Sequence, residues 1–260
     1  MAHQLNHHLN STPHRNVMPV EIGRPWVWIK RGWSDMIDNL GVSLLFGLVF
    51  AAAGYAILTY AASQPYLFTA AVSGFMLVGP LAAAGLYEIS RRHEQGQHTN
   101  LMQSLHGLAR NGESLFYYGV ILAVVMLAWE RISAFLFGLF YHDTAPDMAN
   151  FFHDVFLSGN YVHFVVAYMV IGGAICVALY ALSAISIPMI MDRDVDVKTA
   201  MVTSIQTVGH NITAMAVWAV ILVVLIALGF ATWMVGMVIT LPLAGHATWH
   251  AYRDLVSQNA

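Results

Sequence analysis

Long apolar stretches recur along this chain and constrain its fold more than any other feature. A helix needs about 20 apolar residues to cross a bilayer core of about 30 Å. Such stretches predict six membrane spans, near residues 40–62, 66–90, 114–140, 160–191, 212–231 and 233–252. The last two share one apolar run that is too long for a single crossing, which predicts a break near residues 231–233. The sequence therefore predicts an all-α membrane protein with six transmembrane helices.

The scarcity of charge excludes several classes of protein. Only 10% of the residues are charged and 58% are hydrophobic, whereas about 25% of a soluble domain is charged. This composition excludes a soluble globular enzyme, a disordered protein and a nucleic-acid-binding protein with a basic face. The lipid bilayer is therefore an expected partner and nucleic acid is not. The single cysteine, Cys176, excludes a disulfide bond within the chain.

The basic residues predict the orientation of the spans. Because Lys and Arg concentrate in cytoplasmic loops, a one-sided distribution identifies the cytoplasmic face. All but one of the Lys and Arg residues fall on the same side of the predicted membrane: Arg15, Arg24, Lys30, Arg31, Arg91, Arg92, Arg110, Arg193, Lys198 and Arg253. The exception, Arg131, lies within the third predicted span. Both termini are therefore expected in the cytoplasm.

The beginning of the chain differs from the remainder. Residues 1–23 are polar and rich in histidine, and a segment without apolar periodicity is typical of disorder. We expect a disordered tail over 1–23 and a transmembrane domain over 24–256. A metal-binding role for the tail histidines is the less favoured alternative.

The spans also show signs of an internal repeat. Three returning spans carry a proline late in the segment, at Pro80, Pro188 and Pro242. An amphipathic segment with helical spacing precedes each outgoing span, over residues 26–39, 101–111 and 197–211. This pattern predicts three helical-hairpin repeats, each preceded by an interfacial amphipathic helix, around an axis normal to the membrane. The alternative is six ordinary spans that share signals of the cytoplasmic interface.

Two histidines in the last predicted span are the strongest candidates for chemistry. His246 and His250 are four residues apart, which places both on one face of a helix, and such a pair can bind one metal ion. Aligning the prolines pairs Glu88 with His250 and Asp192 with His246, so repeat symmetry would bring all four to one cytoplasmic cluster. Two histidines and two carboxylates suit Zn, Fe or Mn. A structural hydrogen-bond network is the favoured alternative, and proton transfer is a third.

Glu130 and Arg131 form a second group of candidates because ionisable residues inside a membrane are costly. Neighbouring residues on a helix point about 100° apart, so these two do not simply pair with each other. We favour an arginine at the outer interface with a partner on another helix. A charge on a transport path is the alternative.

Several runs of residues resemble a known family. They are 24–35, 78–92, 186–196 and 242–253. These runs are similar to a family of bacterial integral inner-membrane proteins of unknown function, whose members are often labelled cytochrome c oxidase subunit I. The resemblance covers nearly the whole chain from Arg24 and implies a bacterial inner-membrane location. It carries over no activity. A haem–copper subunit also needs more spans and more intramembrane histidines than this sequence offers.

These observations predict a membrane protein without catalytic activity of its own. The first hypothesis is an accessory or assembly factor for respiratory complexes such as cytochrome oxidase, acting with a partner complex or as a homo-oligomer. The second is a transporter or channel for a small solute or metal ion. The third is a redox helper that binds a metal or haem at His246 and His250. The sequence contains no nucleophile elbow and no phosphate-binding glycine loop.

Overall fold

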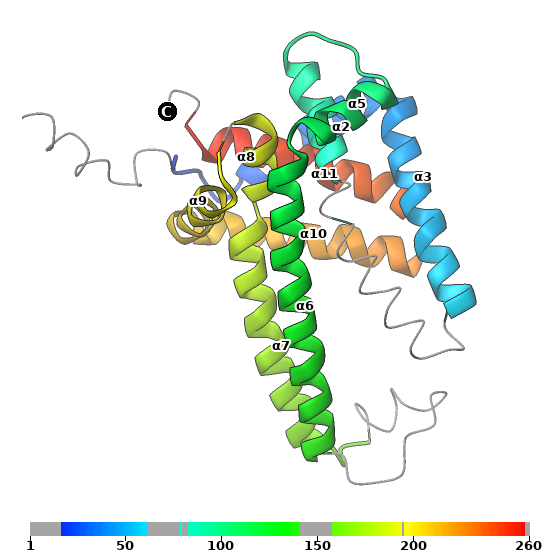
Figure 1. Ribbon diagram of the computed structural model, residues 1–260, viewed down its shortest axis with the longest axis vertical. Coiled ribbons are helices and arrows are strands. Elements are labelled where there is room, and N and C mark those ends of the chain that lie inside the picture. Colours follow the sequence, from blue (N-terminus) through cyan, green and yellow to red (C-terminus); the bar gives the residue numbers. More distant parts are fainter. Residues whose placement is uncertain (1–16, 62–78, 80–82, 141–157, 194, 258–260) are drawn as a thin grey trace, which may run out of the picture. The chain divides into compact units, whose positions relative to one another are not determined.

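The computed structural model describes residues 17–61, 79, 83–140, 158–193 and 195–257, and its regular elements in those ranges are helices. Figure 1 shows them in chain order. They are α2 (Arg24–Asp38), α3 (Leu40–Ala56) with its π-helical end η2 (Ile57–Ala61), helix 83–94, α5 (Leu101–Arg110), α6 (Gly112–Phe140), α7 (Val162–Ser183), α8 (Ser186–Asp192), α9 (Val197–His210), α10 (Ile212–Ala231) and α11 (Met237–Leu255). The prediction of an all-helical protein is thus confirmed for this part of the chain.

Within the described residues, four helical stretches are long and apolar enough to cross a membrane. They are Leu40–Tyr60, Gly112–Phe140, Val162–Asp192 and Ile212–Ala231. The predicted span 66–90 lies largely outside the described residues, which resume continuously at residue 83. The predicted span 233–252 corresponds to α11, which is helical but is not among the four. It carries two histidines, an arginine and an aspartate, and these lower its hydropathy.

The predicted break between the last two spans is confirmed. Helix α10 ends at Ala231 and α11 begins at Met237. In the turn between them, Trp233 and Met234 both adopt positive φ angles, of 52° and 69°. Non-glycine residues rarely take this conformation, and here it reverses the chain within a few residues. The buried side chain of Met234 then packs against Met237 and Ala51.

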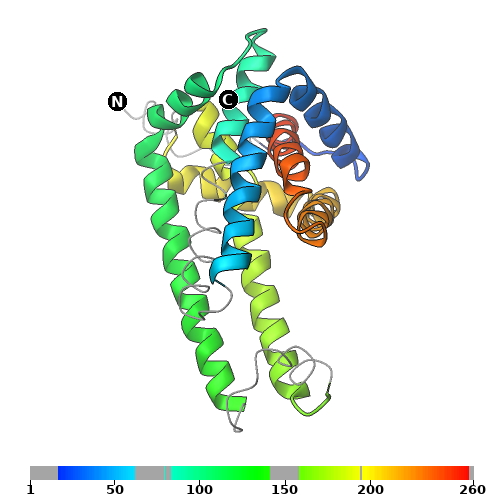
Figure 2. The ribbon, with the colours of Figure 1, turned by 90° about the vertical axis from the view of Figure 1, so that its right-hand side faces the viewer.

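The helices divide into two compact units. One comprises residues 1–119 and 181–260, and the other residues 120–180. In the larger unit α11 is the central helix and packs against α2, α3 and α10 (Figures 1 and 2). Its residues Gly245–Tyr252 are all buried. The core beside it contains Trp28 and Trp218, whose rings meet edge to face at 5.6 Å, a favoured aromatic geometry.

Three short helices lead into long apolar helices through a single asparagine each. Asn39 joins α2 to α3, Asn111 joins α5 to α6, and Asn211 joins α9 to α10. In every case the side-chain amide donates to the backbone carbonyl four residues earlier, at distances of 3.1, 3.4 and 3.2 Å. A helix end leaves its last carbonyls without partners. The asparagine therefore satisfies one of them where the chain changes direction.

A small residue lies seven positions before each of these asparagines and marks a tight helix contact. The Ser104 hydroxyl donates to the Gly85 carbonyl at 2.7 Å, and the Ser204 hydroxyl donates to the Ala181 carbonyl at 2.7 Å. Gly32 is the third of these small residues, and a Cβ added to it would lie only 2.5 Å from the backbone nitrogen of Ala247. Thus α5 packs on helix 83–94, α9 on the end of α7, and α2 on α11.

The predicted span 160–191 is interrupted in the structure. Helix α7 ends at Ser183 and α8 begins at Ser186. Proline cannot donate a backbone hydrogen bond within a helix, and Pro188 follows this interruption. The Ser204 hydroxyl accepts a hydrogen bond from the Ile185 backbone at 3.3 Å. Contact with α9 therefore satisfies a backbone group at the interruption.

Part of the predicted tail makes defined contacts. The Met18 backbone donates to the Leu255 carbonyl at 2.9 Å, and the Val20 backbone donates to the Asn211 side chain at 2.8 Å. Residues 17–23 therefore run along the ends of α9 and α11, although the sequence assigns them to a disordered segment. The first 16 residues of that prediction lie outside the described part of the chain.

The smaller unit contains the middle and distal parts of α6 and most of α7. Trp129 and Tyr168 meet with ring centroids 5.0 Å apart, and Gly172 gives the Trp129 ring room to approach. Leu136 and Phe164 form a buried apolar cluster nearby. The contact between these helices is thus made by aromatic and aliphatic side chains.

Candidate functional site

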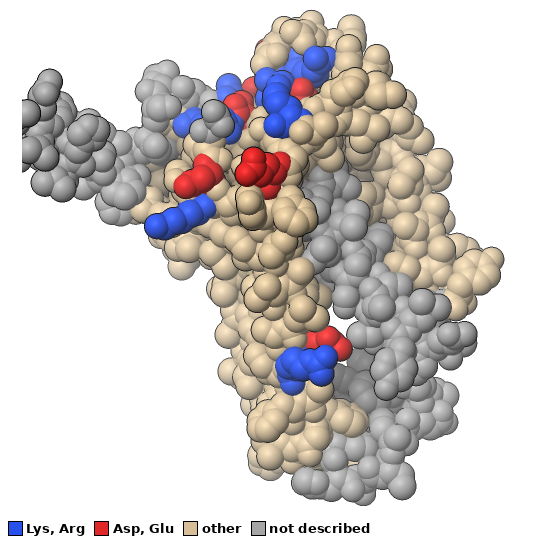
Figure 3. Space-filling view, viewed as in Figure 1, with Lys and Arg blue, Asp and Glu red and all other residues tan. Residues whose placement is uncertain are grey.

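The four residues of the predicted metal cluster all lie in the larger unit. Glu88 is on helix 83–94, Asp192 ends α8, and His246 and His250 are on α11. All except Asp192 are buried. Charged side chains of both signs gather at the end of this unit that carries α5 and α8 (Figure 3). The four residues have different partners within this region.

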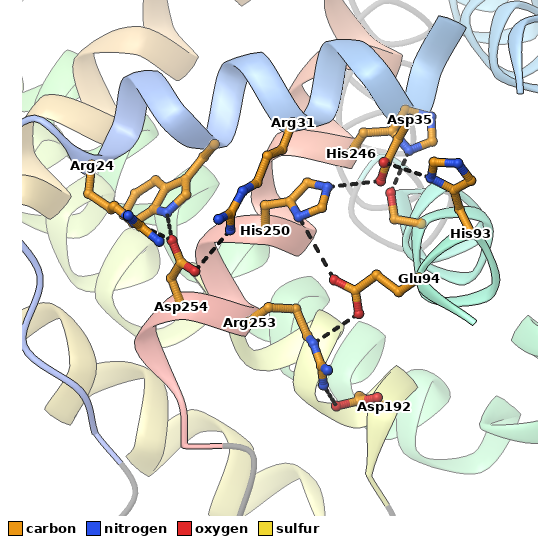
Figure 4. A network of polar contacts seen from close by, with 12 residues as sticks. Arg24, Arg31, Asp35, His93, Glu94, Asp192, His246, His250, Arg253 and Asp254 are labelled. Atoms are coloured by element: carbon orange, nitrogen blue, oxygen red, sulfur yellow. Dashed lines mark hydrogen bonds and ion pairs between the residues drawn. The ribbon is translucent and has the colours of Figure 1, made fainter. Parts of the chain in front are cut away.

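Asp35 of α2 is the centre of the network (Figure 4). Its carboxylate accepts one hydrogen bond from His250 Nε2 and one from His93 Nδ1, each at 2.9 Å. Burial raises the pKa of the Asp35 carboxyl, but hydrogen bonds from His250, Ser90 and His93 and the charge of His250 outweigh burial and hold it below its ordinary value. Asp35 is therefore an ionised acceptor that joins three helices.

His246 extends this network toward α3. The ring is fully buried, with Nε2 2.9 Å from the Ser43 hydroxyl and Nδ1 2.8 Å from the Ser90 hydroxyl. Ser90 also hydrogen-bonds to Asp35. One assignment satisfies every group: Ser43 donates to Nε2, Nδ1 donates to Ser90, and Ser90 donates to the carboxylate. A continuous hydrogen-bond chain thus links Ser43, within an apolar helix, to Asp35.

Glu88 lies among arginines. Arg91 binds its carboxylate through two nitrogens, at 2.8 and 2.7 Å, and Arg92 Nε lies 3.2 Å from it. Arg110, the last residue of α5, approaches the same carboxylate to 3.6 Å. Gly107 makes this approach of α5 feasible, because a Cβ there would lie 2.5 Å from Glu88 Cγ. A buried carboxylate of this kind requires paired charges.

A row of polar contacts continues from His250 through Glu94 and Arg253 to Asp192 (Figure 4). Glu94 lies 3.9 Å from His250 Nδ1 and 3.0 Å from Arg253 Nε. Arg253 also approaches Asp192 at 3.3 Å. The Tyr252 hydroxyl donates to Asp192 at 2.7 Å. Asp192 is therefore linked to His250 only through intervening side chains.

Asp254 ties the end of α11 to the beginning of α2. It accepts hydrogen bonds from Arg24 at 2.6 Å, from the Trp28 indole at 2.8 Å and from Arg31 at 3.2 Å. Burial raises the pKa of the Asp254 carboxyl, but the hydrogen bonds from Arg24 and Trp28 and the charges of both arginines lower it below the ordinary value. This carboxylate is thus a second ionised link between the two helices.

The structure does not bring the predicted metal ligands into one group. In the described residues, no set of three or more His, Cys, Asp or Glu side chains is arranged to hold a metal ion. Glu88 pairs with arginines, His246 lies between two serines, and His250 binds Asp35. The physical reason is that each carboxylate is already occupied by a guanidinium, hydroxyl or imidazole donor.

Sequence reasoning missed Asp35, which connects the candidate histidines. The buried residues of α2 include Trp28, Gly32, Asp35 and Met36, which follow helical spacing on one face. The signal that could have identified Asp35 is the presence of an acidic residue within this apolar stripe. The partners His93 and Ser43 carry no comparable signal, because neither belongs to a motif.

Glu130 and Arg131 lie in the smaller unit and are exposed on α6. Within the described part of the chain, neither residue has a hydrogen bond or ion pair with another side chain. The predicted cross-helix partner of Arg131 is therefore not found there.

A family comparison agrees with the membrane character of the chain. Residues 67–192 match a family model described as "Predicted integral membrane protein (DUF2189)". Comparisons with curated proteins and with solved structures gave no significant match. The matched segment includes Glu88, Arg91, Arg92 and Arg110. The family description names no activity, and it does not support the cytochrome oxidase label.

Proposed function

We propose that this protein is a multi-pass membrane protein without catalytic activity of its own, which acts as an accessory or assembly factor for a larger membrane complex. The observation that carries this proposal is the way its candidate ionisable groups are used. Asp192, His246 and His250 each bind side chains of neighbouring helices. Glu88 pairs with Arg91 and Arg92 of its own helix and also lies 3.6 Å from Arg110 of α5. Groups engaged in this way hold helices together, which is the role of a scaffold. The proposal that this partner is a respiratory complex, such as cytochrome oxidase, rests on the sequence resemblance alone.

We further propose six spans arranged as three repeats, with both termini in the cytoplasm. The three asparagine joints support this arrangement, as do the three small residues that precede them by seven positions. The packing order also supports it, because each short helix contacts the returning helix of another pair: α5 contacts helix 83–94, α9 contacts the end of α7, and α2 contacts α11. That order is cyclic, as a ring of three repeats requires. In this arrangement residues 233–252, which include most of α11, form the sixth span.

A second candidate is a transporter coupled to protons. The hydrogen-bond chain from Ser43 through His246 and Ser90 to Asp35 favours it, since it leads from an apolar helix to the partly exposed His93. Chains of hydroxyl, imidazole and carboxylate groups are typical of proton relays in membranes. A His246→Leu variant would interrupt this chain.

The untagged protein, purified in mild detergent, distinguishes these functions. We expect co-purification with subunits of a membrane complex, no stoichiometric metal and no haem absorbance. Stoichiometric metal that is lost in the His246→Ala/His250→Ala variant would overturn the proposal in favour of a metal-binding redox helper. Proton uptake by vesicles that contain this protein alone, driven by an imposed membrane potential and lost in His246→Leu, would establish the transporter instead.

A further inference from the structure

The arginine cluster around Glu88 holds more positive than negative charge. Arg91, Arg92 and Arg110 surround one carboxylate whose side chain is only 2% exposed. Arg91 binds both carboxylate oxygens through two of its nitrogens. The Glu88 carboxylate is therefore matched by Arg91, and Arg92 and Arg110 add further positive charge around it, although the charge of Asp192 also acts on Arg91.

Those two arginines also retain unused donors. A guanidinium group has five N–H donors. Among the described residues, Arg92 uses only Nε, toward Glu88, and Arg110 uses only one terminal nitrogen, toward the Met191 carbonyl and Glu88. The side chain of Arg92 is 25% exposed and that of Arg110 is 53% exposed. The remaining N–H groups can thus reach a ligand from outside.

The location of the cluster indicates which ligand is suitable. Arg110 ends α5, and α6, which is long and apolar enough to span a membrane, begins at Gly112. Apolar side chains of α5 are exposed, among them Leu101, Met102 and Leu105. An amphipathic helix of this kind lies at the boundary between headgroups and acyl chains. The exposed guanidinium groups are then at the depth of lipid phosphates.

We propose that Arg92 and Arg110 form a binding site for the phosphate group of an anionic phospholipid. Guanidinium forks match phosphate oxygens in geometry and charge. Glu88 and Arg91 act as positioning residues, because the buried carboxylate holds both arginines against one point on helix 83–94. Gly107 permits the contact between α5 and that carboxylate. Anionic lipid at this site would fasten α5 to the membrane surface.

Titration of the full-length protein in dodecyl maltoside tests this proposal. The probes are dioctanoyl phosphatidylglycerol, dioctanoyl phosphatidylcholine and inorganic phosphate, and the readout is tryptophan fluorescence. We expect phosphatidylglycerol to bind at least about tenfold more tightly than phosphatidylcholine or inorganic phosphate. The Arg92→Gln/Arg110→Gln variant should bind it about tenfold more weakly, since charge-assisted hydrogen bonds are lost.

A matched control removes two other basic residues. The Arg131→Gln/Lys198→Gln variant loses the same charge at exposed sites outside the cluster and should bind phosphatidylglycerol as the unchanged protein does. The Arg92→Lys/Arg110→Lys variant keeps the charge and should bind with intermediate affinity, which separates binding from misfolding. Equal loss in the control variant would overturn the proposed site. Equally tight, competitive binding of inorganic phosphate would overturn the lipid as its ligand.

Discussion

Asp35 and His250 are joined by a 2.9 Å hydrogen bond, although 215 positions separate them in the chain. The same carboxylate accepts from His93 on a third helix. This arrangement connects α2, near the beginning of the chain, to α11, near its end. Since both partners are buried, the contact is protected from water, in which exposed ion pairs contribute little.

Removing the charge of Asp35 should destabilise the larger unit. In Asp35→Asn, one amide replaces a carboxylate that accepts from His250 and His93, which leaves the buried donor of His250 poorly matched. Loss of one partner of a buried pair costs about 3 kcal/mol, and we expect a decrease in the free energy of unfolding of that order. Thermal unfolding in detergent measures it.

The control for that variant is Asp38→Asn. The side chain of Asp38 is half exposed and lies 3.5 Å from His93, so its removal should change the free energy of unfolding by less than about 0.5 kcal/mol. Equal destabilisation by both variants would show that the buried position of Asp35 has no special importance.

Acid should weaken the contact between α2 and α11. The pKa values of Asp35 and Asp254 lie below their ordinary value of 3.8 in the folded protein. A carboxyl group whose pKa is lower in the folded protein stabilises the fold at pH values above its ordinary pKa. This stabilisation is lost as the pH falls through the lower pKa of the folded state. We therefore expect the unfolding temperature to fall as the pH drops below about 4.

The Asp254→Asn variant isolates one of these groups. It should be less stable than the unchanged protein at pH 7, and the difference between the two should shrink as the pH falls below about 4. Thermal unfolding at matched pH values measures this difference. A constant difference across the acid range would contradict the assignment of Asp254 as an ionised link.

Gly32 should tolerate no side chain. A Cβ at this position would lie 2.5 Å from the backbone nitrogen of Ala247 and 2.8 Å from its Cα. Because α11 backbone atoms cannot yield as a flexible side chain does, Gly32→Ala should cost about 1–3 kcal/mol. Gly41→Ala is the matched control, since no atom lies within 4 Å of a Cβ there, and it should be neutral or slightly stabilising. Thermal unfolding of the two variants decides between these outcomes.

Asn211 should determine whether residues 17–23 stay attached to the helices. Its side chain accepts from the Val20 backbone at 2.8 Å and donates to the Met18 carbonyl at 3.2 Å. Asn211→Ala removes both hydrogen bonds and should accelerate amide hydrogen exchange in residues 18–20, which mass spectrometry measures. Asn111→Ala is the matched control, because Asn111 occupies the corresponding joint between α5 and α6 and does not contact residues 17–23. Unchanged exchange in Asn211→Ala would show that the bridge between Val17 and Val256 suffices.

Much of the helical organisation could be predicted from the sequence. The short helices at residues 26–39, 101–111 and 197–211 correspond to α2, α5 and α9, because amphipathic spacing and capping are local properties. Asp196 illustrates this, since its side chain caps the α9 backbone at Thr199. The interruption between α7 and α8 was not predicted, because it depends on contact with Ser204 from another helix.

The candidate site was predictable only in part. The sequence indicated that Glu88, Asp192, His246 and His250 lie at the same end of the helices, since each follows an apolar run near basic residues. It did not indicate their partners. Symmetry arguments favoured a common cluster, but Arg91 and Asp35 are closer partners for Glu88 and His250.

The sequence by itself determined that this chain is helical, apolar enough for a membrane, and charged mainly at one end of its helices. These properties follow from composition and periodicity, which act over a few turns of one helix. Only the tertiary structure decided that α11 is the central helix, that Asp35 binds two histidines, and that Arg110 of α5 approaches Glu88. Those contacts join residues far apart in the chain. Whether such side chains meet depends on helix packing, where a glycine such as Gly32 or Gly107 allows two backbones to approach.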